Sequence, residues 1–111
     1  MSKVYIPQVP SRFDAKSKLW VPQVDTSAAA KHGDLVVMLP PEANRLHSAP
    51  LLTALREKMR NFDRGDYIVA LGDPSIIAIT ACLAAANTGG WLRMLKWDRH
   101  SSDYILVEVK I

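Results

Sequence analysis

The chain has little cysteine and no long apolar segment. Its 111 residues contain a single cysteine, Cys82, so a disulfide framework is excluded and a reducing compartment fits. The uncharged stretch Ser75–Ala86 spans about a dozen residues, whereas a helix needs roughly 20 to cross a bilayer. The amino terminus lacks the basic and apolar regions of a signal peptide. We therefore expect a cytoplasmic protein without a membrane partner.

A strong excess of one charge is also absent. The 14 Lys and Arg residues are scattered among 11 acidic residues, giving a net charge of +3 and a pI near 9.2. Strong nucleic-acid binders usually carry a clustered basic footprint. The nearest approach to a cluster is Arg56, Lys58, Arg60 and Arg64, on the outer face of a predicted helix and the turn after it. A solvated helix face is the favoured interpretation. Weak nucleic-acid binding through Arg56, Lys58 and Arg60 is an alternative.

The clearest pattern in the chain is a strand–helix–strand unit. Residues 66–72 contain a short apolar run, Tyr67–Leu71, typical of a strand buried on both faces. Asp73 and Pro74 are favoured residues at a helix start, and the following helix is predicted over 75–87. Gly89 and Gly90 end it, and a strand follows over 91–97. We expect these two strands to be parallel, joined by a right-handed crossover.

The flanking segments complete an α/β domain. A further apolar strand is predicted over 34–39, and the spacing of apolar residues predicts an amphipathic helix over 50–62. Residues 103–111 alternate between apolar and polar, as in a half-buried edge strand paired with 91–97. The predicted fold is a small Rossmann-like α/β domain over residues 34–111. Its sheet is mostly parallel, with an antiparallel C-terminal edge strand.

Residues 1–33 are predicted to form a Pro-rich extended hairpin or arm. Tyr5–Val9 and Trp20–Val24 share the order aromatic, β-branched, Pro, Gln, Val, and proline favours sheet edges or extended arms. An arm that reaches over a partner subunit is the alternative to a hairpin on the body. Asp14 and Asp98 each follow an aromatic residue and precede a Ser-containing turn, which predicts two hairpins with Asp-initiated turns, with a ligand-binding repeat as the alternative.

Three loops are expected to meet at the carboxyl ends of the parallel strands, where open sheets bind ligands. A helix N-terminus there could bind an anion or nucleotide. The candidate residues are Asn44, Arg45, His47, Asp73, Ser75, Asp98 and Arg99. Against such a site, Asp73 fits a helix cap, and neither a G-x-G-x-x-G nor a Walker loop is present. The dispersed histidines predict no metal site, and Cys82 is expected to be an inert core thiol.

The segment from residue 65 to the end resembles small proteins encoded by tailed bacteriophages. The resemblance depends on GDP after a strand, an alanine-rich helix, NTGG, then LKWDR and an alternating last strand. It implies a viral accessory protein that acts in a bacterial cytoplasm or in a virion. It transfers no catalytic residue.

These patterns favour a non-enzymatic accessory protein that acts by self-association and protein–protein interaction with a host or phage protein. The apolar stretch Ile76–Ala86 needs cover on more than one side, which predicts a homo-oligomer. No cofactor or metal is expected. The first alternative is a small nucleotide- or anion-binding module at the strand ends, acting either as a binding protein or as an enzyme.

Overall fold

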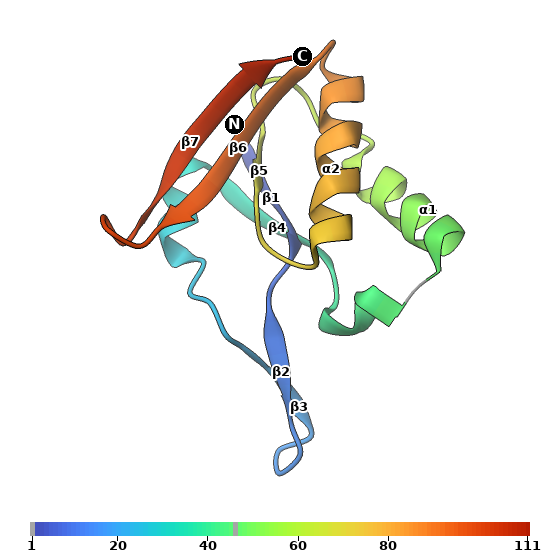
Figure 1. Cartoon of the computed structure of the whole chain (residues 1–111), viewed down its shortest axis with the longest axis vertical. Coiled ribbons are helices and arrows are strands. Elements are labelled where there is room, and N and C mark those ends of the chain that lie inside the picture. Colours follow the sequence, from blue (N-terminus) through green and yellow to red (C-terminus); the bar gives the residue numbers. More distant parts are fainter. Residues whose placement is uncertain (1, 46) are drawn as a thin grey trace.

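The mostly parallel sheet predicted from the sequence is confirmed. The computed structural model describes residues 2–45 and 47–111, and the side chains of Asn44 and Arg45 lie outside that description. Four strands are parallel, and the last runs antiparallel to its neighbour (Figure 1). In spatial order the strands are β4 (Asp34–Leu39), β1 (Lys3–Gln8), β5 (Tyr67–Val69), β6 (Trp91–Asp98) and β7 (Asp103–Lys110).

Strand β1 occupies a central place in this sheet, between β4 and β5, and is not the edge or arm expected from its proline. Val4, Tyr5 and Ile6 are buried, as central strand residues should be. The pairing of β1 with β5 ends at Tyr5, so Pro7 lies beyond the part of β1 that needs hydrogen-bond donors on both sides. A proline near the end of a strand is therefore compatible with a central position.

The N-terminal hairpin exists, but it is shorter than the sequence repeat suggested. It consists of β2 (Ser11–Asp14) and β3 (Leu19–Pro22), which form a separate two-stranded sheet that projects from the body in Figure 1. The exposed rings of Phe13 and Trp20 pack edge to face across it, with centroids 5.6 Å apart.

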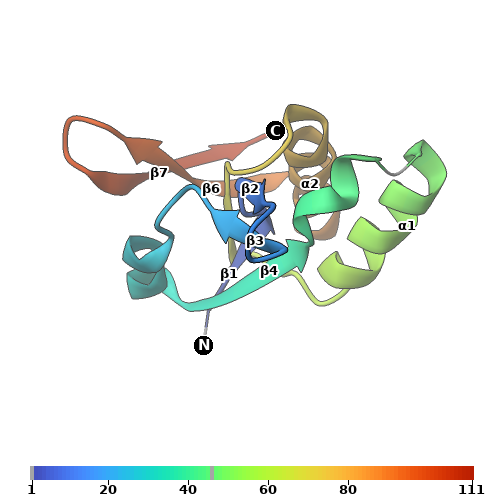
Figure 2. The same cartoon turned by 90° about the horizontal axis from the view of Figure 1, so that it is seen from below.

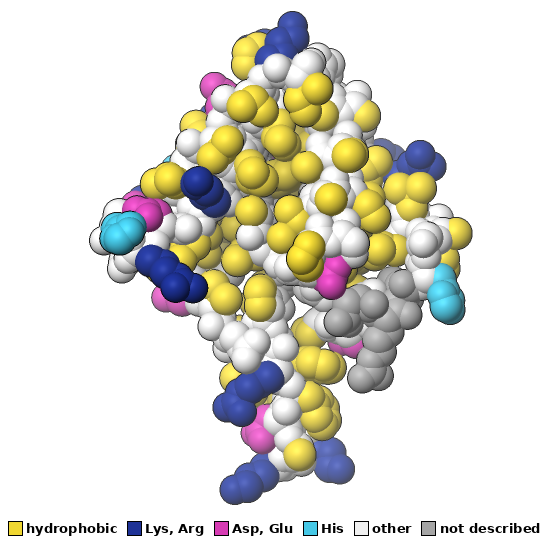
Figure 3. Space-filling view, in the orientation of Figure 1, with side chains coloured by type: hydrophobic (Ala, Val, Ile, Leu, Met, Phe, Trp, Pro, Cys, Tyr) yellow, Lys and Arg dark blue, Asp and Glu magenta, His cyan; other side chains and the backbone are white. Residues whose placement is uncertain are grey.

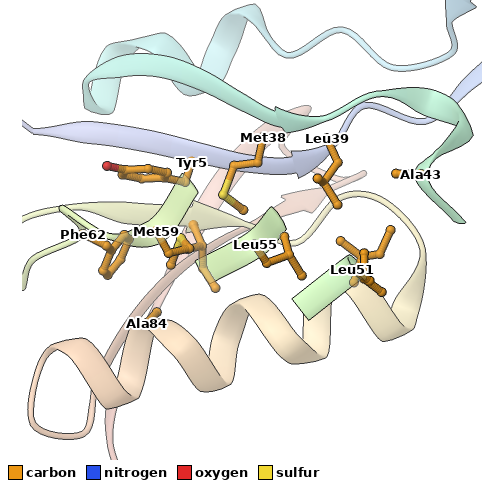
Figure 4. Packing of buried hydrophobic residues seen from close by; sticks show 11 residues of the cluster. Tyr5, Met38, Leu39, Ala43, Leu51, Leu55, Met59, Phe62 and Ala84 are labelled. Atoms are coloured by element: carbon orange, nitrogen blue, oxygen red, sulfur yellow. The ribbon is translucent and has the colours of Figure 1, made fainter. Parts of the chain in front are cut away.

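Two helices cover one side of the sheet. They are α1 (Ser48–Met59) and α2 (Pro74–Asn87), and Figure 2 shows them side by side. The main core lies between them and the strands, where Tyr5 and Met38 face Leu55 and Met59 of α1 (Figure 4). The apolar stripe predicted for the first helix is thus confirmed.

A smaller core lies on the opposite side of the sheet. There the short 3₁₀ segment η1 (Ser27–His32) places Ala29 against Val4, Val69, Leu95 and Tyr104. A second 3₁₀ segment, η2 (Pro41–Arg45), follows β4. The middle of the sheet is therefore buried on both faces, as its continuous apolar strands predict.

Helix α2 is covered on one side only. Its buried residues are Ile76, Thr80 and Ala84, which recur every four positions and face the sheet. The opposite row, Ala78, Cys82 and Ala86, is exposed. The expectation that Cys82 is a core thiol is therefore wrong. The helix is apolar all round, but α1 and the sheet cover only part of its circumference.

Strand β7 is also poorly covered. Val107 and Val109 lie opposite Met94 and Leu92 of β6, which pack against the helix-side core. Directly opposed residues share a face, so the row Ile105, Val107 and Val109 belongs to the helix side of the sheet. Ile105 is 41% exposed and Val109 44% exposed, because neither helix extends over β7.

Candidate functional site

One buried glutamine ties together the carboxyl ends of three parallel strands. Gln8, at the end of β1, is 5% exposed. Its Nε2 donates hydrogen bonds to the carbonyl oxygens of Pro40 and Pro41 after β4, at 3.2 and 3.0 Å. Its Oε1 accepts a hydrogen bond from the N–H of Asp73, beyond β5, at 3.0 Å. The side chain thus fixes the segments that leave β4 and β5.

A hollow of about 190 Å³ opens beside Gln8. The connection after β1 leads to β4, whereas the connection after the neighbouring strand β5 leads to β6, in the opposite direction along the sheet. The connections therefore diverge between β1 and β5. Such a switch point is where open parallel sheets bind ligands. The lining residues are Gln8, Val9, Pro10, Ser11, Gln23, Pro41, Gly72 and Asp73, and we call this hollow the strand-end cleft.

Gly72 brings the backbone after β5 close to Gln8. Its φ is +120°, in the region that favours glycine. A Cβ at this position would lie 2.8 Å from the Cβ of Gln8, closer than side chains approach each other. A glycine is therefore required for the wall of the strand-end cleft to form.

Asp73 is the N-cap of α2, as predicted. Its Oδ1 accepts a hydrogen bond from the N–H of Ser75 at 3.0 Å, and also from the Ser75 hydroxyl. These bonds lower the pKa of Asp73, the hydroxyl contributing most, and so favour the charged carboxylate. A negative charge on the cleft wall disfavours phosphate and other anions there.

The described side chains of the anion-site candidates do not all meet at one place. Among the candidates whose side chains are described, Asp73 alone lines the strand-end cleft. Asp98 is the last residue of β6 and Arg99 lies in the β6–β7 turn. Asp98 accepts hydrogen bonds from the Ser101 hydroxyl at 2.7 Å and from the Ser101 N–H at 3.1 Å. His47 precedes α1 and is exposed. The side chains of two further candidates, Asn44 and Arg45, are outside the described part.

Both Asp-initiated turns are confirmed. Asp14 accepts a hydrogen bond from the Ser17 hydroxyl at 2.8 Å, as Asp98 does from the hydroxyl of Ser101. In each case this bond is the main reason that the pKa of the aspartate is lowered. The similarity is explained by local turn geometry.

The basic residues Arg56 and Lys58 of α1 and Arg60 directly after it are exposed, as expected of a solvated helix face. Arg60 forms an ion pair with Glu57 at 3.1 Å, so part of this charge is neutralised locally. No group of three or more potential metal ligands occurs in the part of the chain that the structure describes.

Sequence reasoning missed a polar cluster on the η1 side of the sheet. Arg93 of β6 donates to the hydroxyl of Tyr67 at 2.6 Å and pairs with Glu108 of β7, with Nε and Oε2 3.0 Å apart. Gln8 was missed as well, because its strand was assigned to an edge. The Arg93–Glu108 pair could have been found from the strand register, since the two residues lie directly opposite.

The chain matches the model of the Phage Pam3 gp32-like protein family over residues 2–111, and it belongs to that family. No curated protein and no solved structure matches it. Among the described residues, none of the helices is both long enough and apolar enough to cross a membrane.

Proposed function

We propose that this phage protein is a non-enzymatic accessory protein that associates with a second copy of itself and with a host or phage protein. The observation that carries the proposal is an apolar surface on the helix side of the molecule. We define the apolar face as the row from β7 and the exposed row from α2: Ile105, Val107, Val109, Ala78, Cys82 and Ala86.

The apolar face is broad and lightly charged. Figure 3 shows hydrophobic side chains spread over α2 and the β6–β7 hairpin, with the charged side chains mostly around the margin. Monomeric proteins rarely leave a contiguous apolar patch of more than a few hundred Å² without a function for it. The small side chains of the α2 row would let a partner approach the helix closely. Cover by other chains is the simplest account of this surface.

The arrangement of polar groups supports a role without catalysis. The candidate residues do not converge in the described part of the chain, and Asp73, Asp14 and Asp98 are occupied by local hydrogen bonds. A general acid or base needs reach to a substrate and a pKa near the working pH. These aspartates have lowered pKa values, so they remain ionised at neutral pH. We expect the protein to act in the bacterial cytoplasm or as part of the virion.

A matched pair of valine variants tests self-association. Val109 lies on β7 and is 44% exposed, and Val37 lies on β4, at the other edge of the sheet, and is 52% exposed. Light scattering at micromolar concentration should give the wild type and Val37→Arg a mass of at least two chains, and Val109→Arg the mass of one. A wild type of single-chain mass would refute the proposal.

The strand-end cleft supports a second candidate function, the binding of a small polar molecule. Its position at the switch point favours this role. Its lining includes the exposed amide-bearing side chain of Gln23, whereas the amide of Gln8 is already hydrogen-bonded to Pro40, Pro41 and Asp73. A thermal-shift screen with nucleotides and neutral polar compounds tests it. A rise in the melting midpoint that is lost in Gly72→Ala would support the cleft as the binding site, provided that this variant is still folded.

A further inference from the structure

We propose that two copies pair antiparallel along β7, with Val107 at the two-fold axis, so that their sheets join into one. This inference depends on the self-association proposed above and specifies the surface and the register. It follows from the unpaired edge of β7, from the contacts that its later charges make with β6, and from the apolar row Ile105, Val107 and Val109, which is centred on Val107.

The outer edge of β7 carries free backbone groups. The N–H of Ile111 donates to the carbonyl of Gly90, on the side of β6, at 2.7 Å. Because backbone groups alternate sides along a strand, the N–H and C=O of Leu106, Glu108 and Lys110 point away from β6. No other strand lies beside this edge among the described residues. These groups are available to a strand from another chain.

The usual protections of an edge strand are weak here. Natural edges are shielded by prolines, bulges, short length or outward charges. Strand β7 spans eight residues, contains no proline and pairs with β6 in one continuous register. Both of its later charges are directed towards β6: Glu108 pairs with Arg93 at 3.0 Å, and the Lys110 Nζ lies 5.8 Å from the centre of the Trp91 ring. Neither charged group therefore prevents another strand from pairing with this edge.

Protection is present only at the start of β7. The carboxylate of Asp103 accepts a hydrogen bond from the N–H of Tyr104 at 2.8 Å and pairs with Lys31 of η1. The Tyr104 hydroxyl donates to the carbonyl of Asp25 at 3.4 Å. The unprotected part of the edge is therefore residues 105–110, and its middle lies at Val107 and Glu108.

The sequence of β7 favours a second copy as the occupant and selects a register. With Val107 on the axis, Ile105 lies opposite the partner's Val109, and Leu106 lies opposite the partner's Glu108. The apolar row Ile105, Val107 and Val109 then lies beside the same row of the partner, so that six apolar side chains share one face of the joined sheet. A shift that centres Glu108 would place two carboxylates opposite each other, which destabilises a strand pair. A shift that centres Leu106 would bring Val109 opposite the partner's Asp103.

Apolar side chains along β7 would contribute to this contact. Ile105, Leu106 and Val109 are 41%, 45% and 44% exposed, and pairing would cover part of this apolar surface on each copy. Typical stable interfaces bury about 800 Å² per partner. The backbone groups of the β7 edge add to this area, and the α2 helices of the two copies would lie on the same side of the joined sheet. An isologous contact of this kind closes at two copies.

Disulfide trapping tests the register. In a Cys82→Ala background, Val107→Cys places two thiols at the axis, where opposed Cα atoms in a non-hydrogen-bonded pair are about 4.5 Å apart and can form a disulfide. Ile105→Cys is the control, because the two copies of residue 105 would be roughly 14 Å apart, four residues along the strand. Mixing the Ile105→Cys and Val109→Cys proteins should restore cross-linking, because those positions are opposed.

We expect mild oxidation to convert most of Val107→Cys to a covalent dimer, with at least a tenfold lower yield for Ile105→Cys alone. Light scattering on the reduced Cys82→Ala protein separates the two proposals. A dimeric mass with no Val107→Cys cross-link, or with equal cross-linking of Ile105→Cys, would overturn the β7 pairing and leave self-association standing. A single-chain mass would overturn both.

Discussion

Replacing Gln8 with Ala tests whether β1 is held centrally by its link to the strand ends. The change removes three hydrogen bonds, to Pro40, Pro41 and Asp73, from a side chain that is 5% exposed. Each bond contributes about 1 kcal/mol, and the orphaned Asp73 N–H adds to the loss. We expect the free energy of unfolding to fall by roughly 2–4 kcal/mol. The melting midpoint should fall by on the order of 10 °C.

Gln23 provides the matched control, because it is the equivalent glutamine of the sequence repeat and is exposed. Urea unfolding followed by tryptophan fluorescence should show Gln23→Ala within about 0.5 kcal/mol of the wild type. Equal losses for the two alanine variants, or no loss for Gln8→Ala, would refute the role assigned to Gln8.

Replacing Gln8 with Glu tests the same role through the pH dependence of folding stability. Gln8→Glu keeps an acceptor for the Asp73 N–H but places a negative charge against two carbonyl oxygens. Burial and these acceptors raise the pKa of the new carboxyl in the folded state. The folded protein then binds the proton more tightly than the unfolded chain. The variant should therefore be least stable relative to the wild type at neutral pH, and the deficit should shrink as pH falls through the raised pKa.

Three further predictions concern the cleft wall, the cap and the basic helix face. Gly72→Ala should lower the free energy of unfolding by roughly 1–3 kcal/mol in urea titrations, because its φ of +120° and the 2.8 Å approach to Gln8 do not suit a side chain. Asp73→Asn should melt close to the wild type, whereas Asp73→Ala should melt lower, because only the amide keeps a capping oxygen. Because the pKa of Asp73 is lowered, the charged carboxylate contributes fully to folding stability at neutral pH, and this contribution declines as pH falls below the ordinary pKa of 3.8. The difference in melting midpoint between Asp73→Ala and the wild type should therefore become smaller in acid. Binding to a fluorescent oligonucleotide should be weak and should fall steeply with salt, since Arg56, Lys58 and Arg60 are exposed; nanomolar affinity at 0.2 M salt would contradict this.

Local patterns along the chain predicted much of the fold. The strand–helix–strand unit was predictable because Asp73, Pro74 and the Gly89–Gly90 pair mark the helix ends through backbone chemistry that does not depend on tertiary context. The two Asp-initiated turns were predictable for the same reason. In each, an aspartate accepts a hydrogen bond from a serine three residues later.

The position of β1 and the cover of α2 were not predictable in this way. Whether Pro7 can sit in a central strand depends on where the neighbouring strand ends, which is a property of the sheet. An apolar helix such as α2 indicates that cover is needed, but it does not show which chain provides it. The strand-end cleft depends on Gln8, whose role follows from the placement of β1.

Amide hydrogen exchange along β7 tests most directly whether a second copy pairs with this edge of the sheet. The N–H groups of Leu106 and Glu108 point away from β6, whereas that of Val107 is directed to β6 in either state, so Val107 serves as an internal control. We predict that Leu106 and Glu108 exchange slowly at high protein concentration and become faster on dilution, while Val107 stays slow. Fast exchange at Leu106 and Glu108 at every concentration would contradict the pairing along β7.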